Sequence, residues 1–224
     1  MEIIFIFYSV FTLNNGLTPR YGVRMILTFN QLKEQYSHLS DPKGRIARDI
    51  KKGALYPLVK GIYETDANIS GAKLAQFIYG PSYLSFDYAL YHYGLIPEVV
   101  YNTFTCATFN KKKIKTYTNH FGTFIYRDIP CEVFNLGVMV FTEEGYSYQI
   151  ATPEKALCDK LYEVAPTRSI KGLQELIFND LRIDEDEFNK LNKQDILKIA
   201  PLYHSTNLNL LAKIIERGKR FSSR

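Results

Sequence analysis

The segment "DPKGRIARDIKKGALYPLVKGIYE" (residues 41–64) constrains the fold more than any other part of the chain. Asp41 followed by Pro42 predicts a helix start, and Gly53 predicts the helix end. Two short strands are expected after it, with a tight turn at Lys60–Gly61. Pro57 has no backbone N–H, so its strand is expected at a sheet edge. The segment therefore predicts a helix followed at once by a hairpin.

The predicted helix separates apolar from basic side chains. At about 100° per residue, one side carries Ile46, Ala47, Ile50 and Ala54, and the other side carries Arg45, Arg48, Lys51 and Lys52. Asp49 is expected at the border of the basic face. Such a face can follow phosphates or enter a major groove, or it can simply be solvated.

The residues before this helix extend the pattern. Thr28 and Gln31 match a capping box, which predicts a helix beginning near Phe29. A helix, a basic second helix and a hairpin in this order are typical of a winged helix-turn-helix, which we predict at residues 25–66. The expected DNA-binding side chains are Lys43, Arg45, Arg48, Lys51 and Lys52, with Lys60 at the hairpin tip.

Residues 1–24 form an extension of uncertain role, and a third helix of a complete winged helix would have to lie there. The apolar run at residues 3–13 is too short for a spanning helix, and it has no positively charged leader. It is interpreted either as a weak anchor or as sequence upstream of a true start at Met25. In the second case the codons for residues 22–24 would contain the ribosome site.

Charge and cysteine content indicate the compartment. The net charge of +5 and the pI of about 8.9 permit a nucleic-acid partner without requiring one. Cys106, Cys131 and Cys158 are odd in number and widely spaced, which favours buried thiols in a reducing cytoplasm. No membrane partner is expected.

The remainder, residues 67–224, predicts a larger domain, so the fold class is α+β with an antiparallel sheet packed with helices. Helical patterns occur at residues 71–79 and 85–93, strands are expected within 99–151, and helices within 152–218. Thr152, Ser169 and Asp184 are the expected helix caps.

Two further groups are candidate contact surfaces. Lys111, Lys112, Lys113 and Lys115 are expected at a hairpin tip, either as secondary contacts to the DNA backbone or as a solubilising turn. Tyr83, Tyr88 and Tyr91 belong to a tyrosine-rich stretch that can form part of a partner surface or pack under the sheet.

Signatures of catalysis are missing from the sequence. It contains no G-x-S-x-G elbow, no H-E-x-x-H and no phosphate loop, and its histidines lack the short spacings of zinc ligands. Glu154, Asp159 and Glu163 are interpreted as structural residues of one helix, and Cys158 as a core residue. We therefore expect no enzyme activity, no catalytic residues, no metal and no cofactor.

Four blocks, "GALYPLVKGIYE", "PSYLSFDYALYHYGLIPE", "FGTFIYRDIP" and "IATPEKALCDKLYE", resemble in order and spacing the AbiEi family of antitoxins from abortive-infection toxin-antitoxin operons. The resemblance implies a winged helix that binds operator DNA and represses its own operon. It also implies a C-terminal domain that counters a nucleotidyltransferase toxin. The alternatives are an interaction protein that neutralises a toxin without binding DNA, and a nucleic-acid-processing enzyme.

Overall fold

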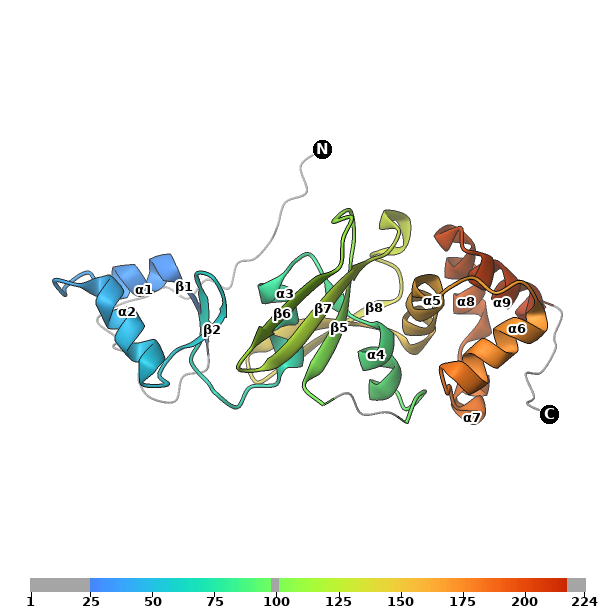
Figure 1. The fold of residues 1–224 in the computed structure, drawn as a ribbon, viewed down its shortest axis with the longest axis horizontal. Coiled ribbons are helices and arrows are strands. Elements are labelled where there is room, and N and C mark those ends of the chain that lie inside the picture. The colour runs from blue at the N-terminus through green and yellow to red at the C-terminus, as the bar shows by residue number, and fades with distance from the viewer. Residues whose placement is uncertain (1–24, 98–100, 217–224) are drawn as a thin grey trace.

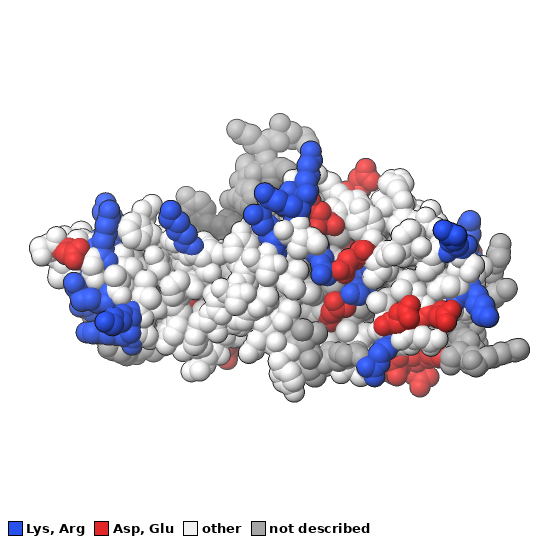
Figure 2. Space-filling model, in the orientation of Figure 1, with Lys and Arg blue, Asp and Glu red and all other residues white. Residues whose placement is uncertain are grey.

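The computed structural model describes residues 25–97 and 101–216, and its fold class is α+β. The extension at residues 1–24, which includes the apolar run at residues 3–13, and the predicted helix end at Gly218 lie outside the described residues. Figure 1 shows an elongated molecule, with α1 and α2 at one end, a large sheet in the middle and the C-terminal helices at the other end. Lys and Arg side chains gather over the end formed by α1 and α2 (Figure 2).

The N-terminal unit contains β1 (Ile26–Thr28), α1 (Phe29–Gln35), α2 (Pro42–Lys51), β2 (Tyr56–Val59) and β3 (Ile62–Glu64). Its antiparallel sheet has the order β1-β3-β2, so Pro57 lies on an edge strand as predicted. The capping box is also confirmed, because Thr28 Oγ1 accepts from the Gln31 N–H and Gln31 Oε1 accepts from the Thr28 N–H. Strand β1 was not predicted, since three residues are too few to show a strand pattern.

The central sheet differs from the predicted antiparallel one. It consists of β4 (Tyr83–Leu84), β5 (Thr103–Thr108), β6 (Lys115–Asn119), β7 (Gly122–Asp128), β8 (Val138–Glu143) and β9 (Tyr146–Ala151), in the order β6-β7-β5-β4-β9-β8. Strands β5 and β7 pair in parallel, as do β4 and β9. The prediction failed because neither β4, which lies between β5 and β9, nor β6 was recognised. With β6 at the edge, β7 lies between β6 and β5 and runs parallel to β5.

The helical segments lie beside the central sheet and form the C-terminal end of the molecule (Figure 1). They are η1 (Gly71–Lys73), α3 (Ala75–Ile78), α4 (Phe86–His92), η2 (Cys131–Val133), α5 (Pro153–Glu163), α6 (Ile170–Glu175), η3 (Leu176–Asp180), α7 (Glu185–Lys190), α8 (Lys193–Ile199), η4 (Ala200–Tyr203) and α9 (Thr206–Glu216). The predicted caps Thr152, Ser169 and Asp184 each accept a bond from the backbone N–H three residues later.

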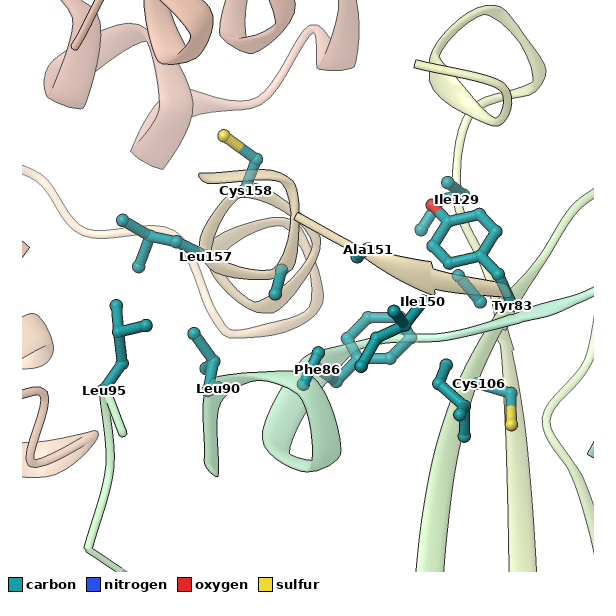
Figure 3. Packing of buried hydrophobic residues seen from close by; sticks show 14 of the residues in the cluster. Tyr83, Phe86, Leu90, Leu95, Cys106, Ile129, Ile150, Ala151, Leu157 and Cys158 are labelled. Atoms are coloured by element: carbon teal, nitrogen blue, oxygen red, sulfur yellow. The ribbon is translucent and has the colours of Figure 1, made fainter. Parts of the chain in front are cut away.

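The main core forms where α4 and α5 meet the sheet. Figure 3 shows side chains from β4, α4, β9 and α5 gathered there, among them Phe86, Leu90 and Leu157. Cys106 and Cys158 are buried in this core as predicted, but Cys131 is exposed. The expectation of buried thiols therefore failed for Cys131, which begins the surface segment η2.

A buried ion pair lies within this core. Lys155 and Asp159 on α5 are both fully buried, with Lys155 Nζ 3.0 Å from Asp159 Oδ1. Three hydroxyl groups complete the coordination of the carboxylate: Tyr203 donates to Oδ1, and Ser85 and Tyr83 donate to Oδ2. Burial raises the pKa of Tyr83 and Tyr203 well above the usual value, so both remain neutral donors. The network therefore joins α5 to β4, to the start of α4 and to η4.

A second set of polar contacts joins the N-terminal unit to the sheet. The buried Glu64 carboxylate at the end of β3 accepts from the N–H groups of Thr65 and Asp66, and from the Tyr146 hydroxyl at 2.9 Å. Nearby, Asn119 donates to the Leu58 carbonyl at 3.0 Å. The strand that ends the hairpin is thus attached directly to the central sheet.

The Asp159 network predicts a large effect of removing its acceptor. Asp159→Ala leaves Lys155 as a buried unpaired charge, so we expect the free energy of unfolding to fall by about 3–5 kcal/mol. The control Asp195→Ala breaks the exposed Asp195–Lys198 pair and should cost less than about 1 kcal/mol. Urea denaturation of both variants measures the difference, and equal losses would contradict the assignment.

Candidate nucleic-acid interface

Local capping fixes the start of α2. Asp41 Oδ1 accepts the Gly44 N–H at 2.8 Å, and Pro42 occupies the first turn, where a missing N–H costs nothing. A side chain at position 44 would collide with this cap, because a Cβ there would lie 1.7 Å from Asp41 Oδ2. Gly44 therefore lets a carboxylate close the end of a basic helix.

The buried side of α2 differs from the predicted apolar stripe. Ile46 is buried as expected, but Asp49 is also buried and Ala47 is exposed. Asp49 faces inward because the Tyr36 hydroxyl donates to Asp49 Oδ2 at 2.8 Å within the small core of the N-terminal unit. The buried side is therefore rotated toward Asp49, and Ala47 moves to the solvent side.

All the predicted DNA-binding side chains are exposed. On α2 they are Lys43, Arg45, Arg48 and Lys51, and they are joined by Lys52 at its C-cap and by Lys60. Lys60 lies at the β2–β3 turn, where Gly61 adopts a φ of +85° and its carbonyl accepts the Phe29 N–H at 2.8 Å. That bond fixes the hairpin tip beside the start of α1. The structure thus places all these cations on the N-terminal unit.

The cations differ in their partners. Arg45 Nε lies 2.9 Å from Asp49 Oδ2, whereas Arg48 is 3.7 Å from Asp41 and both of those side chains are 59% exposed. Within the described residues, no carboxylate pairs with Lys43, Lys51, Lys52 or Lys60. Exposed and unpaired ammonium groups of this kind retain their full attraction for phosphate.

The lysine cluster at residues 111–115 is not a hairpin tip, and that prediction was wrong. The segment connects β5 to β6, which are separated in the sheet by β7. Asp128 Oδ2 accepts the N–H groups of Lys111 and Lys112, and Lys111 Nζ reaches the Gly80 carbonyl at 3.3 Å. Lys115 belongs to β6, while Lys112 and Lys113 are exposed. The cluster therefore lies on the central sheet, away from α2.

The tyrosine group does not form one surface. Tyr83 is buried and bonded to Asp159, so its predicted place in a partner surface is wrong. Tyr88 is half-buried against Phe104, and burial raises its pKa to about 12. Tyr91 alone of the three is exposed. Of the two tyrosines on α4, Tyr88 therefore faces the core and Tyr91 faces solvent.

The most specific polar contacts of the molecule have no signal in the sequence. Tyr36 and Asp49 are thirteen positions apart on different helices, and Tyr203 lies forty-four positions from Asp159. Only the fold brings these pairs together. Across residues 25–97 and 101–216, no group of His, Cys, Asp or Glu side chains could hold a metal ion, and no helix is long and apolar enough to cross a membrane.

No family model matches the chain, and no curated protein matches it either. Among solved structures, it is similar to the crystal structure of the RV2827C protein from Mycobacterium tuberculosis, with a TM-score of 0.47 and 15% sequence identity over 84% of this chain and 75% of that one. A similarity this distant establishes neither a shared family nor a shared activity.

Because the side chains of the basic face are exposed, we predict that they contribute little to the stability of the fold. Replacing Arg48, Lys51 and Lys52 with Ala should change the free energy of unfolding by less than about 1.5 kcal/mol in total, because exposed sites typically contribute within about 0.5 kcal/mol each. The matched variant Ile46→Ala empties a buried site on the same helix and should cost about 2–5 kcal/mol. Thermal unfolding followed by circular dichroism compares them, and a triple variant as unstable as Ile46→Ala would show that the face is structural.

Proposed function

We propose that the protein binds DNA through its N-terminal unit, which acts as a winged helix, and that it is an autorepressing antitoxin of an abortive-infection toxin-antitoxin operon. The observation that carries the proposal is the exposed basic face of α2 beside a hairpin tipped by Lys60. In this role α2 enters the major groove, and Lys60 contacts the neighbouring backbone.

The charges of the unit suit this role. No acidic partner within the described residues pairs with Lys51, Lys52 or Lys60. A phosphate can therefore bind these lysines without breaking an ion pair inside the protein. The contacts of Glu64 with Tyr146 and of Leu58 with Asn119 attach the hairpin to the central sheet and restrict its orientation. A fixed wing loses little freedom on binding, which favours affinity.

The antitoxin assignment rests on the four blocks that resemble the AbiEi family. Three of them contribute to the network at Asp159 or to the sheet beside it: Tyr83 and Ser85 come from the second block, β7 from the third and Asp159 from the fourth. The resemblance therefore supports a common core for the C-terminal domain more directly than a common surface. The proposed partners are the operator of its own promoter and a cognate nucleotidyltransferase toxin in the cytoplasm, and no cofactor or catalytic residue is assigned.

The alternative is an interaction protein that neutralises a toxin by direct contact. The exposed Tyr91 and the apolar side chains of the edge strand β8, among them Met139 and Val140, favour it, since apolar surface of this kind suits a protein partner. A mobility shift with the protein's own promoter separates the two functions, because only the first requires DNA.

Binding to the promoter should weaken steeply with salt. Displacing counterions with about four or five cations gives a log-log slope of about −3 to −5 per protomer. Fluorescence anisotropy between low and physiological salt measures it. A promoter affinity that does not change with salt concentration would exclude phosphate contacts by the basic face.

Replacing Arg48, Lys51 and Lys52 with Ala should lower promoter affinity about a hundredfold, because each lost phosphate contact costs about 1 kcal/mol or more. Toxin protection should persist when the variant is expressed from an unrelated promoter. Mobility shift and growth rescue are the two measurements, and the control changes Lys112 and Lys113 to Ala, which removes two exposed lysines from the central sheet. Unchanged DNA binding would contradict the winged-helix role, and lost protection in a folded variant would show that one surface serves both functions.

A further inference from the structure

Arg45 differs from every other cation of the basic face in how it is held. Its Nε lies 2.9 Å from Asp49 Oδ2, and its guanidinium carbon lies 5.5 Å from the centre of the Tyr36 ring. The side chain of Asp49 is only 6% exposed, whereas that of Arg45 is 47% exposed. One edge of the guanidinium is thus held at the protein surface while the rest of the side chain meets solvent.

Asp49 is in turn held by a buried hydroxyl. The Tyr36 hydroxyl on the C-cap of α1 donates to the same Oδ2 atom at 2.8 Å. The hydrogen bond that Arg45 Nε donates to the Asp49 carboxylate also raises the pKa of Arg45, so the guanidinium stays charged. A hydrogen-bonded relay therefore runs from the Tyr36 hydroxyl in the small core, through the Asp49 carboxylate, to the exposed guanidinium of Arg45.

This relay suits recognition of a base more than a phosphate. A flexible cation neutralises phosphate equally well wherever it lies along the backbone, but reading a base requires a fixed donor geometry. Because Nε is occupied by Asp49, the terminal nitrogens of Arg45 remain as a fork, and an arginine fork matches the O6 and N7 acceptors of guanine. Arg45 also lies near the N-terminal end of α2, the part of a recognition helix that meets base edges.

We infer that Arg45 is a specificity-determining residue that reads a guanine in the major groove, with Asp49 and Tyr36 as its positioning residues. The inference rests on the proposed DNA-binding function of α2. Lys43, Lys51, Lys52 and Lys60, which lack such a relay, serve affinity. Arg48, paired only loosely with exposed Asp41, belongs with them.

The test uses the full chain and its own promoter, first footprinted and then altered one base pair at a time. For Arg45→Lys we expect discrimination at one or two G·C pairs to fall about 5- to 100-fold, while affinity for unrelated DNA and the salt slope stay as in wild type. The matched control Arg48→Lys should keep full discrimination. Asp49→Asn and Tyr36→Phe should lose part of it at the same positions, and circular dichroism reports whether each variant is folded.

The outcomes separate the two proposals. Wild-type protein that binds no DNA would remove the proposed function itself. If the wild-type protein prefers its promoter and Arg45→Lys keeps the same base preference, only the inference about Arg45 is overturned. Loss of affinity for promoter and unrelated DNA alike in Arg45→Lys would also overturn it, because that result is typical of a phosphate contact.

Discussion

The fold of the large domain depends on one buried carboxylate. Asp159 accepts bonds from Lys155, Tyr203, Ser85 and Tyr83, so a single side chain on α5 connects the helix to the sheet and to the C-terminal segment η4. A buried charge is costly unless every lone pair is satisfied, and here the partners come from distant parts of the chain. The arrangement therefore favours one packing of the helices over others, since few alternatives would supply the same donors.

The same principle operates on a smaller scale in the N-terminal unit. Buried Asp49 is satisfied by Tyr36 and Arg45, and buried Glu64 by Tyr146 and the backbone of Thr65 and Asp66. The first contact sets the rotation of α2, and the second fixes the hairpin against the sheet. The orientation of the basic face is thus determined by interior carboxylates, and the exposed lysines have no part in it.

Local sequence signals were reliable where the structure is local. The capping box at Thr28, the helix start at Pro42 and the turn at Gly61 lie where predicted, because each depends on residues within one turn. The errors concern features that depend on contacts between residues far apart in the sequence. The strand β6 was missed, which made a crossover look like a lysine-tipped hairpin, and Tyr83 and Asp49 look like surface residues until their partners are known. The candidate cations themselves were found from sequence, whereas the difference between Arg45 and the lysines was not.

We propose that α2 and the β2–β3 turn form the surface that meets DNA. Amide hydrogen exchange of the full chain, with and without a duplex of its own promoter, tests this claim most directly. We predict slower exchange in residues 41–61, with the central sheet and the helices beyond it unchanged. Protection that appears elsewhere while residues 41–61 exchange as in the free protein would contradict the account.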